Sequence, residues 1–172
     1  MRTAIAVALA ASLAWTTPAG AGSSETYLPD GWIRLHPESP AWHGDNALTD
    51  SAETVKAKLE KGETIRIDLA AQNDGNTVDQ FFMKGECSPS RAFRITFTTG
   101  GRPGFTKITA LVKTGKIRSP EIRPGHRMNH YQLLAKRLSR GRSGASLTCS
   151  VTYTSATDST KSDTVIARIS AR

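Results

Sequence analysis

Alternating apolar and polar positions run through most of the chain, and a clear early example lies at residues 64–85. There Ile65, Ile67 and Leu69 alternate with mostly polar neighbours, which is the period of a strand with one buried face. A run of turn-forming residues, Asn-Asp-Gly-Asn at 73–76, follows this segment and precedes a second apolar stretch. The pattern therefore predicts two strands joined by a loop.

Six further segments show the same alternation, and glycine, proline and asparagine turns separate most of them. They are residues 54–60, 93–98, 107–113, 128–138, 146–154 and 164–170. A helical turn is the alternative at 54–60. A short helix is the alternative at 128–138, where the spacing of the surrounding strands favours a strand. Seven or eight short strands without a long amphipathic helix predict an all-β fold, an immunoglobulin-like antiparallel β-sandwich with Greek-key connections.

Residues 1–21 have the pattern of a signal peptide. Arg2 precedes an apolar run at residues 4–15, and Ala-Gly-Ala at 19–21 forms a cleavage site of the A-x-A type. The apolar run is shorter than the ~20 residues that a membrane-spanning helix needs, and no later segment is apolar enough. We therefore expect a secreted or extracytoplasmic protein that is cleaved near Ala21 and has no transmembrane segment.

Residues 22–50 have the weakest periodicity of the mature chain, because turn-forming residues interrupt each apolar run. Ile33 and Leu35 predict one edge strand in this region. Trp42 has two interpretations: it plugs one end of the sandwich, or it exposes its ring for stacking on a ligand. We therefore divide the mature chain into an N-terminal extension with an edge strand at 22–50 and one sandwich domain at 51–172.

Two cysteines, Cys87 and Cys149, lie in the predicted exported part. An oxidising compartment favours a disulfide between them. Cys149 lies on the apolar side of the 146–154 alternation, so we expect it to point inward. Closing a loop of this length would stabilise the fold by about 4 kcal/mol in the chain-entropy model.

Charge is distributed unevenly along the mature chain. Residues 22–90 contain twelve acids and six bases, whereas residues 91–172 contain sixteen bases and three acids. A solvated face that aids solubility is one interpretation of the basic half. The sharper hypothesis is a polyanion-binding face that recognises an anionic cell-envelope polymer. The candidate residues for this face are Lys136, Arg137, Arg140 and Arg142.

Nucleic-acid motifs are missing from this basic half, since it contains no recognition-helix pattern, zinc-finger spacing or aromatic RNA-binding motif. We therefore expect no sequence-specific binding of nucleic acid, because charge alone gives salt-sensitive and sequence-blind affinity.

Side chains that would support catalysis or metal binding are scattered. The four histidines are His36, His43, His126 and His130. His126 and His130 have the spacing of one helical face, but a Pro-Gly turn precedes them and no carboxylate or thiolate stands at the usual spacing for zinc. Turn-forming hydrogen bonds are a simpler interpretation than calcium binding for Asn73, Asp74, Asn76 and Asp79. We therefore predict no catalytic residue, no metal site and no cofactor.

The order of four segments resembles a known family. They read IRIDLAAQNDGNTVDQFFMKG, FRITFTTGG, IRPG and SLTCSVTYTSATDSTKSDTVIARI. Over residues 51–172 this order is similar to the immunoglobulin-like repeats of bacterial surface and secreted proteins, of the CARDB kind (cell-adhesion-related domain of bacteria). The matching positions are Asn73, Gly75, Asp79, Pro124, Gly125, Thr154, Ser155, Asp163 and Val165. The resemblance implies a non-catalytic adhesion, spacer or scaffolding module, and it supplies no catalytic residue.

Two hypotheses for function follow. The first is an exported, non-catalytic immunoglobulin-like module for adhesion, scaffolding or envelope interaction, with an anionic polymer or another surface protein as its partner. The second is an exported enzyme or metal-dependent hydrolase accessory protein that uses histidine residues.

Overall fold

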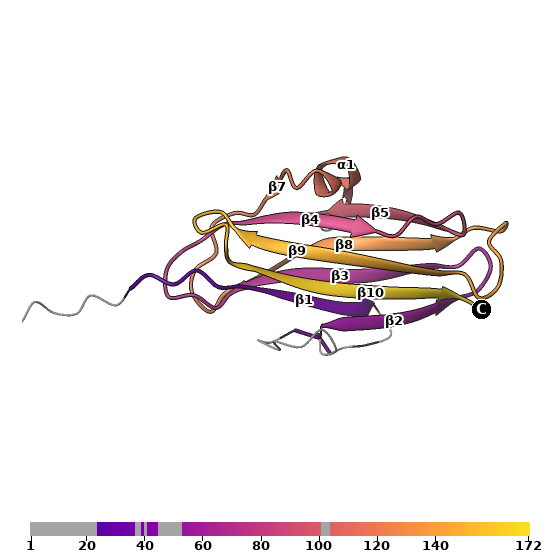
Figure 1. Cartoon of the computed structure of the whole chain (residues 1–172), viewed down its shortest axis with the longest axis horizontal. Helices are drawn as coiled ribbons and strands as arrows, with labels where there is room; N and C mark the ends of the chain where they lie inside the picture. Colours follow the sequence, from indigo (N-terminus) through magenta and orange to yellow (C-terminus); the bar gives the residue numbers. More distant parts are fainter. Residues whose placement is uncertain (1–23, 37–38, 40, 45–52, 101–103) are drawn as a thin grey trace, which may run out of the picture.

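Two five-stranded sheets pack face to face in the computed structural model of the chain (Figure 1). The structure describes residues 24–36, 39, 41–44, 53–100 and 104–172, so the predicted signal peptide lies outside the described residues. Sheet A contains, in spatial order, β1 (Pro29–His36), β3 (Thr64–Asn73), β8 (Arg127–Arg137), β5 (Phe93–Thr99) and β6 (Thr106–Lys107). Sheet B contains β2 (Thr54–Leu59), β10 (Ser162–Ala171), β9 (Ser146–Ser155), β4 (Phe81–Cys87) and β7 (Ile117–Arg118).

The prediction of an all-β sandwich is confirmed, and β1 is the predicted edge strand. A strand is also the correct interpretation at both ambiguous segments, which form β2 and β8. One pairing departs from the antiparallel prediction, because β2 runs parallel to β10. Residue alternation reports which face of a strand is buried and carries no information on the direction of its neighbour.

The predicted strand at 107–113 is wrong. After the two residues of β6 the chain turns into the short helix α1 (Thr109–Lys113), in which the amide of Val112 donates to the carbonyl of Ile108 at 3.0 Å. Ile108 and Val112 are both buried. Their four-residue spacing fits a helical turn as well as it fits alternation. The helix covers the β4 and β5 side of the sandwich (Figure 1).

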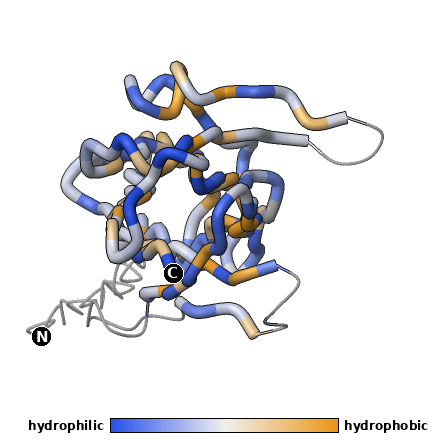
Figure 2. Tube along the Cα trace, turned by 90° about the vertical axis from the view of Figure 1, so that its right-hand side faces the viewer, coloured by the Kyte–Doolittle hydropathy of each residue, from blue (hydrophilic) through white to orange (hydrophobic). Residues whose placement is uncertain are grey.

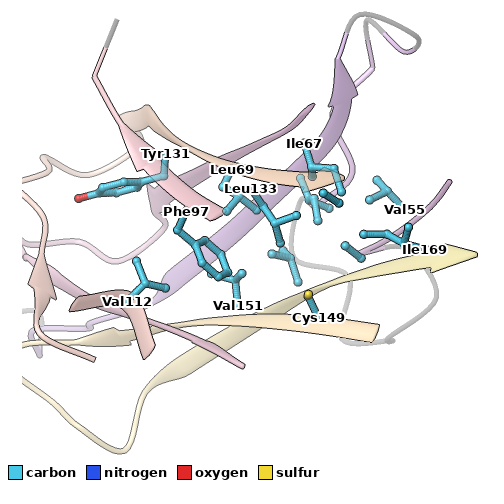
Figure 3. Packing of buried hydrophobic residues seen from close by; sticks show 14 of the residues in the cluster. Val55, Ile67, Leu69, Phe97, Val112, Tyr131, Leu133, Cys149, Val151 and Ile169 are labelled. Carbon is cyan, nitrogen blue, oxygen red and sulfur yellow. The ribbon is translucent and has the colours of Figure 1, made fainter. Parts of the chain in front are cut away.

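The core lies between the two sheets and holds apolar side chains from both (Figure 3). Buried and exposed residues alternate along the strands as the two faces are passed in turn. Figure 2 looks down the strands and shows hydrophobic and hydrophilic residues side by side throughout the sandwich. Phe97 and Val112 meet beside Gly85, where a side-chain Cβ would lie 2.7 Å from atoms of both. A glycine is therefore required at position 85 for α1 to pack onto β4.

The disulfide prediction is confirmed, since Cys87 and Cys149 are bonded. They are directly opposite in the register of β4 and β9, and Cys149 is buried as expected. The bond therefore reinforces neighbouring strands of sheet B and does not join the two sheets.

The loop after β3 is a structural corner, as the turn interpretation predicted. The buried Asn73 side chain donates to the carbonyls of Thr77 and Ile122, both at 2.8 Å, and accepts from the amide of Gly75 at 3.0 Å. Asp79 accepts from the hydroxyl of Thr157 at 3.0 Å. These side chains connect loops at one end of the sandwich. Within the described residues, no helix is long and apolar enough to span a membrane.

Candidate functional site

The outer face of sheet B carries cations on its edge strand β2 and on the neighbouring strand β10. Lys56 of β2 lies opposite Arg168 of β10, and Lys58 lies opposite Ser170. All three cationic side chains are exposed, because Val55, Ala57 and Leu59 take the inward positions of β2. The register therefore places cations from segments more than a hundred residues apart side by side.

A hollow of about 1020 Å³ lies over these strands; we call it the sheet B groove. Small hydroxyl side chains form part of its floor, with Thr148 opposite Arg168 and Ser146 opposite Ser170. The full lining is Lys56, Ala57, Lys58, Glu60, Glu63, Ser146, Leu147, Thr148, Arg168, Ile169, Ser170 and Arg172. The groove thus combines flexible cations with hydroxyl groups that can donate hydrogen bonds.

The acids at the groove are occupied by other groups. Glu60 pairs with Arg172 at 3.4 Å, and Glu63 accepts a hydrogen bond from the amide of Glu60. Lys56, Lys58 and Arg168 make no ion pair among the residues that the structure describes. These three charges are therefore available to an anion.

The four basic residues predicted from the sequence do not form one surface. Lys136 lies on β8 opposite Arg94, on the outer face of sheet A. Arg140 and Arg142 are exposed in the loop between β8 and β9. This loop adjoins the end of β10, because backbone hydrogen bonds join Gly144 and Ala145 to Ala171. Arg140 and Arg142 thus lie near the groove end, and Lys136 lies across the sandwich from it.

Arg137 is a correction to the predicted binding surface, since it is only 5% exposed. Its guanidinium donates to the carbonyls of Arg172 at 2.6 Å, Leu59 at 3.1 Å and Gly141 at 3.4 Å. These contacts tie β8 of sheet A to β2 and β10 of sheet B. The head group is therefore used inside the fold and is not offered to a ligand. The polyanion prediction for Lys136, Arg140 and Arg142 stays a prediction.

The outer face of sheet A organises its cations around one carboxylate. Asp68 pairs with Arg34 at 3.0 Å, with His36 at 3.2 Å and with Arg66 at 3.3 Å. Gln132 donates to the same carboxylate at 3.3 Å. The Asp68 side chain is 11% exposed, so its neighbours replace most of the water that it would otherwise bind.

Two tryptophans on this face stack with arginines. Arg34 stacks over Trp42 at 4.5 Å from the ring centre, and Arg127 lies 5.1 Å from Trp42 and 4.6 Å from Trp32. Trp42 is half-buried on this face, so it does not plug one end of the sandwich. The other interpretation was that the Trp42 ring stacks on a ligand. In the structure, Arg34 and Arg127 of the chain itself stack on this ring.

Three carboxyl groups form a separate cluster. Oxygens of Asp30, Glu53 and Asp163 lie within 4.8 Å of one another, and the first two residues are buried. Asp163 accepts from the amide of Gly31 at 2.6 Å. Burial raises the pKa of the nearby Tyr153, and Tyr131 and Asp163 raise it further. Among the described residues these three side chains are the group whose spacing would suit a metal ion.

The histidines are distributed over several elements. His36 pairs with Asp68, and the backbone of His43 bridges to Ile33. His126 and His130 line a smaller hollow of about 350 Å³ that also includes Glu121. His36 and His43 lie at β1, whereas His126 and His130 lie at the start of β8. The four histidines therefore do not form one site, as an enzyme that uses them together would require.

The groove residues were missed by the sequence interpretation, although part of the signal was present. Lys56 and Lys58 occupy the outward positions of the predicted strand at 54–60. Arg168 joins them only through the parallel register with β10, and a residue pattern does not encode that register. The burial of Arg137 could have been predicted from the sequence, because its position continues the inward alternation of Leu133 and Ala135.

Comparisons with known proteins extend the description of the fold. No protein-family model and no curated protein sequence matches the chain. The N-terminal domain of PorA is similar, with a TM-score of 0.50, 11% identity, and coverage of 83% of this chain and 97% of that one. PapD-like domain 7 of human CEP192 gives a TM-score of 0.40 at 12% identity, covering 95% of this chain and 98% of that one.

An enzyme is also among the similar structures. A family 123 glycoside hydrolase from Clostridium perfringens gives a TM-score of 0.44 at 10% identity, over 70% of this chain. The chain spans only 23% of that enzyme's length. Likeness at such identities concerns the fold and assigns no activity. The strand order of its two sheets makes the chain an all-β protein with a sandwich of immunoglobulin-like type.

Proposed function

We propose that this chain is an exported, non-catalytic immunoglobulin-like module of the CARDB kind that binds an anionic chain through the sheet B groove. The observation that carries the proposal is the convergence of Lys56, Lys58 and Arg168 on one hollow, without an acidic partner among the described residues. The disulfide supports an oxidising compartment outside the cytoplasm. The ligand class is an anionic chain of the cell exterior, because repeated negative charges match repeated cations.

The geometry favours a chain over a single small anion. The three cations lie on two strands, and Arg140 and Arg142 continue the positive charge from the groove end into the loop between β8 and β9. Each contact is exposed and individually weak, so useful affinity requires several charges that act together. Binding should therefore weaken steeply as the salt concentration rises.

The test is retention of the purified mature protein on heparin and polyphosphate resins at increasing salt. The groove variant combines Lys56→Gln, Lys58→Gln and Arg168→Gln. A matched control combines Arg94→Gln, Lys107→Gln and Lys113→Gln, which removes the same charge from exposed positions of β5, β6 and α1. We expect the groove variant to lose at least tenfold in affinity at low salt and the control to lose less than threefold.

Equal losses in the two variants would overturn the proposal, because net charge alone would then explain retention. Two smaller variants divide the predicted basic segment. Arg140→Gln with Arg142→Gln should weaken binding by a few fold, whereas Lys136→Gln should leave it unchanged because Lys136 faces away from the groove.

A further inference from the structure

The edge of sheet B at Lys56 and Lys58 of β2 presents backbone groups that have no partner among the described residues. In a parallel ladder, alternate residues of a strand direct their N–H and C=O groups to the same neighbour. The carbonyls of Glu53 and Leu59 accept from the amides of Ile166 and Arg172 of the β10 segment, at 2.9 and 3.1 Å. Val55 and Ala57 lie between these two residues at odd positions, so their N–H and C=O groups also face β10. Lys56 and Lys58 turn their N–H and C=O groups the other way, to the open edge.

The other sheet edges are paired over part of their length in the part of the chain that the structure describes. Ile33 of β1 exchanges two backbone hydrogen bonds with His43, both at 2.8 Å, so the outer side of β1 already has a partner. β6 and β7 contain two residues each and cover two residues each of β5 and β4. β2 contains six residues, and β10 is its only partner among the described strands. Lys56 and Lys58 are the residues of this edge whose outward backbone groups have no partner among the described residues.

The side chains along this edge select what can pair with it. Lysines on an edge strand discourage pairing with an uncharged or apolar strand, because the partner would bury the ammonium groups. The same charges favour an acidic strand. Lys56 and Lys58 are two residues apart on one face, a spacing of about 6.6 Å along the strand. Acids at alternate positions of an added strand have the same spacing.

We propose that β2 accepts an extended acidic peptide segment of a partner protein as a sixth strand of sheet B. The backbone of Lys56 and Lys58 forms up to four hydrogen bonds with the peptide. Acidic side chains at alternate peptide positions lie over the sheet B groove, where Lys56, Lys58 and Arg168 neutralise them. The intervening peptide side chains are apolar and extend the inner face beside Val55 and Ala57. This inference rests on the proposed function, since the groove cations hold the acidic side chains.

The test uses a synthetic seven-residue peptide that alternates glutamate with valine, and two N-methylated versions of it. One version carries methyl groups on the glutamate amides and the other on the valine amides. Only one set of amides faces β2 in an added strand. We expect one version to bind at least tenfold more weakly than the parent peptide and the other to bind within about threefold. Equal affinities of the two versions would overturn the added strand.

Amide hydrogen exchange supplies a second readout on the protein. Saturation with the parent peptide should slow exchange at the amides of Lys56 and Lys58 by at least tenfold, and it should leave the already paired amide of Ile33 unchanged. Unchanged exchange at both lysine amides in a saturated sample would also overturn the inference.

Polyphosphate binding separates the two proposals. If the two methylated peptides bind alike while polyphosphate retention still depends on Lys56, Lys58 and Arg168, the strand inference fails and the groove proposal stands. If polyphosphate retention and peptide affinity are both insensitive to these three residues, the groove proposal fails as well.

Discussion

The outer faces of the two sheets use similar cations in different ways. On sheet A, Arg34 and Arg66 are held by Asp68, and Arg127 lies between two indole rings. On sheet B, Lys56, Lys58 and Arg168 surround a hollow without an acidic partner in the described residues. Both faces are basic, so charge alone does not separate them. What distinguishes the two faces is the number of partners that each cation has within the fold.

This difference predicts separate roles for the two faces. A cation that is already paired and partly desolvated contributes to the stability of the native state, and its removal leaves other groups unsatisfied. A cation that is exposed and unpaired contributes little to stability and keeps its charge for a ligand. Four variants test this division.

Asp68→Ala should have the largest effect on stability. Removing the carboxylate leaves Arg34, His36 and Arg66 crowded without their shared partner, and we expect the free energy of unfolding to fall by about 3 kcal/mol. Urea denaturation measures the change. The control is Glu86→Ala, which breaks the exposed Lys84–Glu86 pair on sheet B and should cost less than about 0.5 kcal/mol. Similar losses in both variants would remove the contrast between the faces.

Arg137→Met should follow, with a loss of about 2 kcal/mol in the free energy of unfolding, because hydrogen bonds from a charged group to three carbonyls disappear. Retention on heparin should remain within threefold of wild type at a temperature where the variant is folded. A normal unfolding midpoint combined with a tenfold loss of retention would instead assign Arg137 to the binding surface.

Trp42→Ala should lower the free energy of unfolding by about 1.5 kcal/mol, since the ring stacks with both Arg34 and Arg127. Trp42→Phe keeps an aromatic face and should recover part of the loss. Urea denaturation of the two variants gives the comparison. If alanine and phenylalanine behave alike, stacking with the arginines contributes nothing measurable.

The groove variant with Lys56→Gln, Lys58→Gln and Arg168→Gln should have the smallest effect on stability. We expect its free energy of unfolding to stay within about 0.5 kcal/mol of wild type, because no partner in the described structure is lost. The same urea titration checks this value. A loss above 2 kcal/mol would mean that these cations are structural, and the distinction between the faces would then fail.

The sequence was a good guide to the strands and a poor guide to the site, for one physical reason. The period of a strand is local, so Ile65, Ile67 and Leu69 reveal their buried face without knowledge of the rest of the fold. The groove depends on the parallel register between β2 and β10, which sets Lys56 against Arg168. Such a register is decided by packing of the whole sandwich and leaves no mark in either segment alone.

Two local errors have similar origins. At Ile108 and Val112 a four-residue interval satisfied both helical and strand periods, and packing against Phe97 over Gly85 decided for the helix. At Arg137 charge suggested exposure, but alternation from Ala135 placed the side chain inward, where backbone carbonyls receive it. Alternation was the better guide in the second case because the end of a sandwich offers backbone carbonyls that can accept hydrogen bonds from a long cation.

The disulfide between β4 and β9 has a mechanical consequence. The chain enters β1 at one end of the sandwich and leaves β10 at the other (Figure 1), so tension along the chain pulls these strands lengthwise and shears their hydrogen bonds together. Cys87 and Cys149 are 62 residues apart in sequence. While they stay bonded, the segment between them cannot extend. A stretched, oxidised molecule is therefore roughly 220 Å shorter than a reduced one.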